Sequence, residues 1–168
     1  MARPATDLTL AEAVCLTLVV REPRHGWAIV KTLAPDGEVG RVWTLSRPLT
    51  YRVLDALAQR ALIEPRGEET GSGPPRTIWR ATEKGKRLAR TWLRTPVAHP
   101  RDVRTEFLLK LVLGASGADL ARAQLTAFAP VFAGLERAAR ADSSDVVARW
   151  RAESAEATRR FLRSLAAG

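Results

Sequence analysis

The sequence predicts a mainly α-helical protein with one small β-hairpin, in which an N-terminal head is followed by long C-terminal helices. Three observations lead to this prediction. Apolar residues recur at helical spacing along most of the chain, two short β-prone segments flank a loop rich in Gly, Ser and Pro, and a linker with two prolines (TPVAHP, residues 95–100) separates the two parts. We therefore expect two domains, at residues 1–95 and 96–168.

Composition favours a basic globular protein. The 168 residues include 27 Lys and Arg against 18 Asp and Glu, a formal net charge of +9, and the hydrophobic content of 46% is enough for a core. Such a charge favours a polyanion, either nucleic acid or an anionic membrane surface, although many small domains are basic. Most of the cations are arginines, which donate two parallel hydrogen bonds to phosphate or guanine. A genome rich in G and C is the alternative explanation.

The residues that metal and nucleophilic chemistry require are scarce. The single cysteine, Cys15, excludes an internal disulfide and a Cys-based zinc site, and its apolar surroundings place it in the core. The two histidines, His25 and His99, are too few for a metal or Cys/His centre. No signal peptide is visible, and the longest apolar run, at residues 13–20, is far shorter than the roughly 20 residues of a membrane span. We expect a cytoplasmic, soluble protein that is not an enzyme and holds no cofactor or metal.

The head is expected to contain four helices and a hairpin. Thr9 and Glu12 have the spacing of a capping box for the first helix, and Ser46 followed by Pro48 is a typical start for the third. Residues 39–45, before the third helix, are β-prone and short enough for a small strand. The expected helices cover residues 10–21, about 26–33, 47–60 and 83–94, and the expected hairpin strands cover residues 62–66 and 76–81.

The third helix is amphipathic. A helical wheel places Leu49, Val53, Ala56 and Leu57 on one side, and the opposite side carries Arg47, Tyr51, Arg52, Asp55 and Gln59. Three helices followed by a hairpin is the order of a winged helix-turn-helix, whose third helix enters the major groove while the hairpin, or wing, reaches the adjacent DNA backbone. In that arrangement Thr50 and Tyr51 can donate to phosphate, Arg47 and Arg52 can reach phosphate or guanine, and Arg66 and Arg76 flank the wing loop.

Each of these features has a plainer interpretation. The polar side of the third helix is also typical of a solvated surface, and Arg66 with Arg76 also fits a simple cross-strand pair. The order of the elements, and no single residue, favours DNA binding.

The C-terminal part is expected to consist of helices at residues 101–112, 118–141 and 144–166, with Pro130 kinking the middle one. In the last helix Val147, Trp150, Ser154, Ala157 and Phe161 alternate at spacings of three and four, which is typical of a coiled-coil seam. Because a 95-residue head cannot bury both long apolar stripes, we expect a second copy of the chain to cover them.

Four short motifs resemble those of PadR-type transcriptional regulators. Residues 25–29 are similar to the His-Gly-Tyr-x-Ile motif of that family, residues 45–54 to its recognition helix, residues 61–64 to the entry of the wing, and residues 75–85 to its second wing strand and the helix that follows. The resemblance covers about residues 10–92. Three residues depart from the family pattern: Trp27 replaces a tyrosine, and Pro48 and Ala61 stand where glycine is common.

The resemblance implies a homodimeric repressor that binds a palindromic double-stranded DNA operator and is released by a small aromatic or drug-like effector. By position it implies that Tyr51 contacts phosphate or the groove, with Ser46, Arg47 and Thr50 beside it, and that Arg76 is the wing contact.

Two further expectations remain open. If an effector pocket exists, we expect it near Trp92, the linker and Phe107, and core packing is the alternative for the five tryptophans. A second hypothesis is a ligand-binding or protein-adaptor module on the same scaffold with weak or no specific DNA affinity. That hypothesis is favoured by the acidic residues Asp55, Glu64, Glu68 and Glu69.

Overall fold

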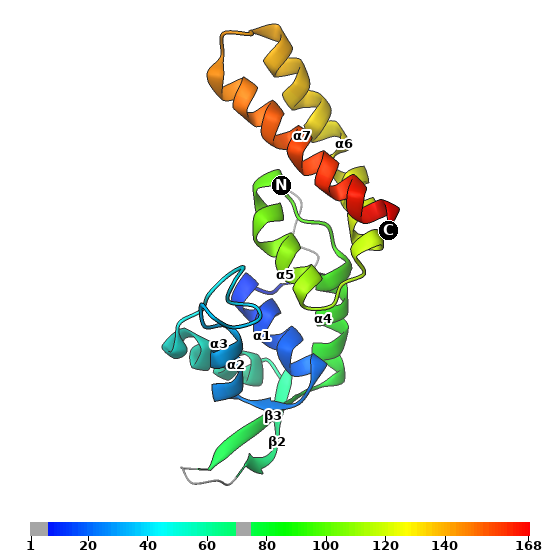
Figure 1. Ribbon diagram of the computed structural model, residues 1–168. Coiled ribbons are helices and arrows are strands. Elements are labelled where there is room, and N and C mark those ends of the chain that lie inside the picture. Colours follow the sequence, from blue (N-terminus) through cyan, green and yellow to red (C-terminus); the bar gives the residue numbers. More distant parts are fainter. Residues whose placement is uncertain (1–6, 70–74) are drawn as a thin grey trace. The chain divides into compact units, whose positions relative to one another are not determined.

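The computed structural model describes residues 7–69 and 75–168, and it confirms a mainly helical protein with a small antiparallel sheet (Figure 1). Residues 70–74 of the expected wing loop lie outside the described residues. The elements in chain order are α1 Leu10–Arg21, β1 Arg24–His25, α2 Gly26–Thr32, α3 Arg47–Gln59, β2 Ile63–Glu69, β3 Arg76–Ala81, α4 Glu83–Arg94, the 3-10 helix η1 Pro100–Arg104, α5 Glu106–Val112, α6 Gly117–Ala141 and α7 Val146–Ala167.

The chain divides into two compact units. The first comprises residues 1–93 and 108–114, and the second comprises residues 94–107 and 115–168. No helix among the described residues is long and apolar enough to cross a membrane.

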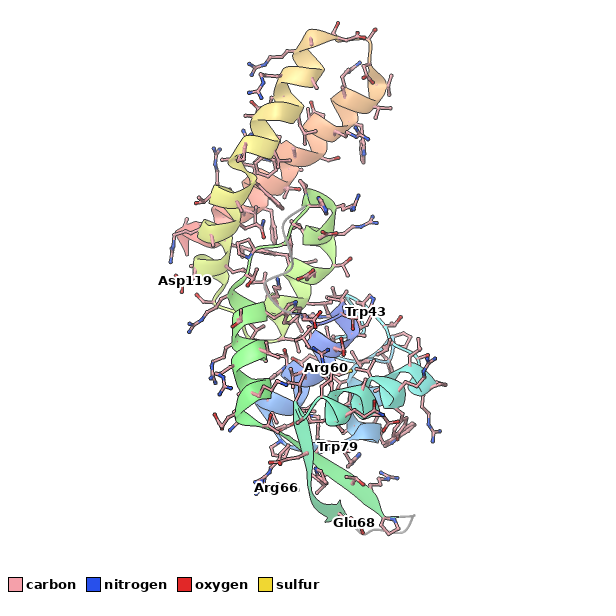
Figure 2. The ribbon with its side chains drawn as sticks, turned by 180° about the vertical axis from the view of Figure 1, so that it is seen from behind. Trp43, Arg60, Arg66, Glu68, Trp79 and Asp119 are labelled. Carbon is pink, nitrogen blue, oxygen red and sulfur yellow. The ribbon has the colours of Figure 1, made fainter. Side chains whose placement is uncertain are left out.

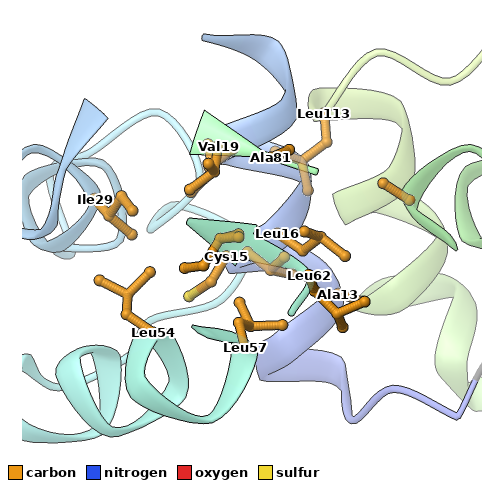
Figure 3. Packing of buried hydrophobic residues seen from close by; sticks show 14 of the residues in the cluster. Ala13, Cys15, Leu16, Val19, Ile29, Leu54, Leu57, Leu62, Ala81 and Leu113 are labelled. Atoms are coloured by element: carbon orange, nitrogen blue, oxygen red, sulfur yellow. The ribbon is translucent and has the colours of Figure 1, made fainter. Parts of the chain in front are cut away.

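Helix α1 is the centre of the first unit. Its predicted capping box is present, since the N–H of Glu12 donates to Oγ1 of Thr9 (3.2 Å) and the N–H of Thr9 donates to Oε2 of Glu12 (2.8 Å). Every residue from 12 to 19 is buried, as expected for a helix that is apolar on nearly all faces. Cys15 is part of this core (Figure 3), and burial raises the pKa of its thiol to about 12. Cys15 is therefore an inert core residue, as predicted.

The segment between α2 and α3 is a series of turns, so the expectation of a small strand at residues 39–45 is wrong. The N–H groups of Val39 and Gly40 both donate to the carbonyl of Thr32, at 3.1 and 3.2 Å, which wraps the segment onto the end of α2. A Cβ on Gly40 would lie 1.6 Å from the carbonyl oxygen of Ala34, so only glycine fits there. Val39 is apolar because it is buried in the core, not because it belongs to a sheet.

The sheet has the strand order β1-β3-β2 and is antiparallel throughout. Strand β1, Arg24–His25, was not expected from the sequence, and it pairs with Trp79 and Ile78 of β3. Strand β2 extends to Glu69, three residues beyond its expected end at Arg66. The sheet thus anchors the hairpin at the start of α2.

The first turn of α4 packs closely against the backbone just before β2. Thr82 caps α4 as predicted, since its Oγ1 accepts the N–H of Gly85 at 3.1 Å. A Cβ on Gly85 would lie 2.1 Å from the carbonyl oxygen of Leu62. Ala61, just before Leu62, has a positive φ of 53°.

The second unit is built on the antiparallel pair α6 and α7. Its core contains Phe107, Phe128 and Phe132, and the amide of Gln124 is buried with both its groups bonded to the backbone of Val97 (2.7 and 3.1 Å). Helix α6 continues through Pro130 without interruption.

The single helix expected at residues 101–112 is divided into η1 and α5. The division falls at Thr105, whose φ of −126° and ψ of −78° leave the helical conformation.

Candidate nucleic-acid interface

Helix α3 buries Thr50, Leu54 and Leu57, whose spacings of four and three place them on one face. The five residues expected on the polar side of the wheel are all exposed, and Leu57 is buried as expected. The expectation is wrong for two residues of the first turn. Leu49, expected on the apolar side, is 45% exposed, whereas Thr50 is fully buried. The Thr50 hydroxyl donates to the carbonyl of Ser46 at 3.0 Å, which satisfies its only polar group inside the helix. Thr50 is thus a core residue, and its expected role as a phosphate donor is corrected.

The exposed face begins at Ser46, the N-cap residue of α3 as predicted. Its backbone is extended (φ −66°, ψ 152°), but its side chain makes no capping hydrogen bond. Pro48, in the first turn, has no N–H and therefore needs no capping partner. The Ser46 side chain remains at the exposed start of the helix.

The guanidinium of Arg47 lies beside two aromatic rings. Its Cζ is 5.4 Å from the ring centroid of Trp27 and 6.0 Å from that of Tyr51. The ammonium of Lys31 lies 5.9 Å from the Trp27 centroid. At such distances the negative face of a ring attracts a cation. The rings therefore favour one position of the Arg47 guanidinium at the surface, and Trp27 has a role besides core packing.

His25 sets the start of α2 and so places Trp27. Its Nδ1 accepts the N–H of Ala28 at 3.1 Å, which confirms the expectation that this histidine caps or packs at the start of the helix. Helix α2 follows at once from Gly26.

The two arginines of the wing differ in their place in the sheet: Arg66 lies at an irregularity of β2, and Arg76 lies in the regular register of β3. Figure 2 shows Arg66 on the β2–β3 hairpin. The strand register shifts between Pro65 and Gly67, so Arg66 is the extra residue of a β-bulge, a feature that redirects a side chain. Arg76 lies opposite Glu69, not opposite Arg66. The alternative of a cross-strand pair between the two arginines is therefore wrong.

Two other arginines of the first unit are held in ion pairs. Nε of Arg80 donates to Oε1 of Glu64, directly opposite in the sheet, at 2.9 Å. Nη1 of Arg60 donates to Oε1 of Glu12 at 2.7 Å. By contrast, no carboxylate among the described residues forms an ion pair with any of the four remaining candidates, Arg47, Arg52, Arg66 and Arg76. All four are exposed.

The two residues expected near an effector are both buried, in different units. Trp92, in the first unit, is 5% exposed, and the ammonium of Lys110 lies 5.1 Å from its ring centroid. Phe107, in the second unit, is fully buried and packs edge to face with Phe161, with ring centroids 6.3 Å apart. No group of three or more His, Cys, Asp or Glu residues that could hold a metal occurs in the described residues.

A helical core, a recognition helix with an exposed polar start and a β-hairpin wing define the winged helix-turn-helix class. Residues 15–91 match the model of the Transcriptional regulator PadR-like family. This segment, somewhat less than half of the chain, is thus similar to the PadR-like family of transcriptional regulators.

Several solved structures of PadR proteins are also similar to this chain. Bacillus subtilis PadR in complex with operator DNA is 20% identical, with a TM-score of 0.49 over 92% of this chain and 97% of the other. Bacillus subtilis PadR in complex with p-coumaric acid is 20% identical, with a TM-score of 0.47 over 95% and 98%. A PadR family regulator from Eggerthella lenta DSM 2243 is 27% identical, with a TM-score of 0.38 over 48% and 70%. No curated protein matches the sequence.

Proposed function

We propose that this chain is a transcriptional regulator that binds specific double-stranded DNA through the first half of α3 and the wing arginines. We propose further that it acts as a homodimeric repressor at a palindromic operator. The observation that carries the proposal is the set of exposed arginines without carboxylate partners, on the two elements that a winged helix-turn-helix directs at DNA. An unpaired surface guanidinium can bind phosphate without first breaking an ion pair.

The two exposed arginines on α3, Arg47 and Arg52, have different proposed roles. Arg52 lies on the outward face of the helix and reaches into the groove, where a guanidinium recognises guanine or phosphate. Arg47, beside the rings of Trp27 and Tyr51, loses less conformational freedom on binding than an unrestrained arginine would. Ser46 and Tyr51 add hydroxyl donors to phosphate, and both are exposed.

The wing extends the contact along the backbone. Arg66, at the bulge, and Arg76, at the start of β3, approach phosphates beside the groove that α3 occupies. Glu68 and Glu69 on the same hairpin oppose phosphate, so the wing contact comes from its arginines.

The second unit supports homodimerisation. Helix α7 buries Ala148, Ala155 and Leu162, yet a second apolar face of the same helix remains exposed. Trp150 is 72% exposed and Val147 is 57% exposed on that face. Exposed apolar residues at these spacings are typical of a helix that packs on another copy. A two-fold dimer presents two α3 helices to the DNA and therefore requires two inverted half-sites.

Release by a small aromatic effector is the remaining part of the proposal. Its expected contacts are Trp92 in the first unit and Phe107 in the second. The test is quenching of tryptophan fluorescence by planar aromatic acids in the wild type and in Trp92→Phe. Quenching that weakens in Trp92→Phe supports this contact, and the same quenching in both proteins contradicts it.

A gel shift with the DNA upstream of the regulator's own gene tests DNA binding, at two salt concentrations. Because neutralised phosphates release counterions, affinity should fall steeply with salt. Arg52→Ala and Tyr51→Ala should lose specific binding while the dimer stays folded. Arg160→Ala is the matched control, since it removes an exposed arginine from α7. Unchanged binding in both α3 variants would contradict the placement of α3 in the groove and favour a ligand-binding or adaptor module.

A further inference from the structure

Leu49, at the start of α3, is an apolar side chain that does not pack into the core. Among the described residues of the first unit, the large apolar side chains that are exposed are Leu49, at 45%, and Tyr51, at 39%. Both lie in the first two turns of α3. The other large apolar residues described in that unit are buried or partly buried, and Leu54 and Leu57 of the same helix are fully buried.

The surroundings of Leu49 indicate what it can contact. Arg52 follows it by three residues and therefore lies on the same side of the helix, and Arg47 and Ser46 are exposed at the same end. One leucine exposes too little apolar surface for an apolar protein interface, and the residues around it are charged or polar. It fits a surface that is anionic at its edges and carries an isolated apolar group.

The major groove of DNA has one apolar group of that kind, the 5-methyl group of thymine. Side chains in the N-terminal turns of a recognition helix are the ones that reach base edges. We propose that Leu49 contacts a thymine 5-methyl group in each half-site and so contributes to sequence specificity. This inference rests on the proposed function, because it requires α3 to lie in the major groove.

The expected effect follows from the size of one methyl group. Burying one such group against an apolar side chain changes the affinity about fourfold. When the same thymine is changed in both half-sites of a palindrome, the two effects multiply to about fifteenfold.

The experiment replaces thymine by deoxyuridine, which removes the methyl group and leaves base pairing intact. A duplex is first selected from random DNA with the full-length chain, and each thymine pair related by the palindrome is then replaced in turn. For the wild type we expect one pair whose replacement weakens binding about fifteenfold. Leu49→Ala should bind the thymine duplex about as weakly as the wild type binds that deoxyuridine duplex, and it should no longer distinguish the two.

Two control variants make the result specific. Leu49→Met keeps an apolar side chain and should retain most of the discrimination, and Gln59→Ala changes an exposed residue in the last turn of α3 and should leave it intact. A selected half-site without thymine, uniform tolerance of deoxyuridine, or discrimination that persists in Leu49→Ala would overturn the inference while specific binding stands. Failure of the wild type to select any sequence would instead overturn the proposed function, and this inference with it.

Discussion

A Cβ atom on Gly26 would lie 2.7 Å from Cε1 of Tyr51. The hydrogen at position 26 is therefore what allows the Tyr51 ring to lie against the start of α2. Glycine is not needed there for its backbone freedom, since Gly26 does not have a positive φ. It is needed because an aromatic ring from α3 occupies the space that a side chain would fill. The position of a proposed DNA contact thus depends on a residue of the preceding helix.

The first prediction concerns Gly26→Ala. The added methyl group should displace the Tyr51 ring, which is 39% exposed and can turn toward solvent. Affinity for the selected duplex should fall about fivefold, the loss expected for one hydrogen bond, while the thermal midpoint changes little. In a Tyr51→Phe background, which keeps the ring but lacks the hydroxyl, Gly26→Ala should have no further effect on binding. Additive losses in that background would show that Gly26 acts through another route.

The second prediction concerns Ala61, which has a φ of 53° in the connection between α3 and β2. A non-glycine residue in this left-handed region is strained, by about 1 kcal/mol or more. Ala61→Gly should therefore raise the free energy of unfolding by about 1 kcal/mol, measured by urea denaturation. Ala58→Gly, in the last turns of α3, is the control and should destabilise by about the same amount, as expected for glycine in a helix. A loss of stability in Ala61→Gly would contradict the strain.

The third prediction concerns pH and the pair formed by Glu12 and Arg60. Burial raises the pKa of the Glu12 carboxyl, but hydrogen bonds from the backbone of Thr9 and from Arg60 outweigh it, and the pKa lies below its ordinary value of 4.5. The ionised carboxylate therefore stabilises the fold above that pH, and the stabilisation is lost as the pH falls through the lower folded value.

The measurement is the free energy of unfolding of the wild type and Glu12→Gln between neutral pH and pH 3. At neutral pH the variant should be less stable by about 1 kcal/mol, because glutamine can keep the capping bond to Thr9 but lacks the charge that strengthens the bond from Arg60. The two curves should converge as the pH falls below 4.5. A difference that stays constant over the whole range would refute the role of the charge.

The fourth prediction concerns the exposed apolar face of α7. Trp150→Glu places a charge on the face that a second copy is proposed to cover. The dissociation constant of the dimer, measured by sedimentation equilibrium, should therefore rise at least tenfold. Arg160→Glu introduces the same carboxylate on a different exposed face and should remain dimeric. Circular dichroism should show unchanged helix content in both. A wild type that is monomeric at high concentration would disprove the dimer outright.

Much of this fold follows from local sequence signals. The capping box of Thr9 and Glu12, the Thr82 cap of α4 and the bounds of α4 were all predictable, because each depends on residues close in the chain. Strand β1 was not predictable, since a two-residue strand exists only through its distant partner β3. Residues 39–45 have a strand-like composition but form turns. Their apolar residue Val39 is buried in the core, so its hydrophobicity does not indicate a strand.

The candidate site was predictable as a segment but not residue by residue. The helical wheel placed Leu49 on the apolar side, and the winged-helix arrangement made Thr50 a phosphate donor, but Leu49 is exposed and Thr50 is buried. Threonine can enter the core because its hydroxyl bonds to the carbonyl of Ser46, a local arrangement that hydropathy does not represent. The bulge at Arg66 and the rings beside Arg47 depend on contacts between elements and have no signature in the sequence.

The most direct test of the central claim is one comparison of dissociation constants. The full-length chain is titrated at physiological salt with its selected duplex and with a scrambled duplex of the same length and base composition. Sequence-specific binding predicts an affinity for the selected duplex about a thousandfold higher or more. Equal affinity for the two duplexes would contradict the proposal that this chain reads DNA sequence.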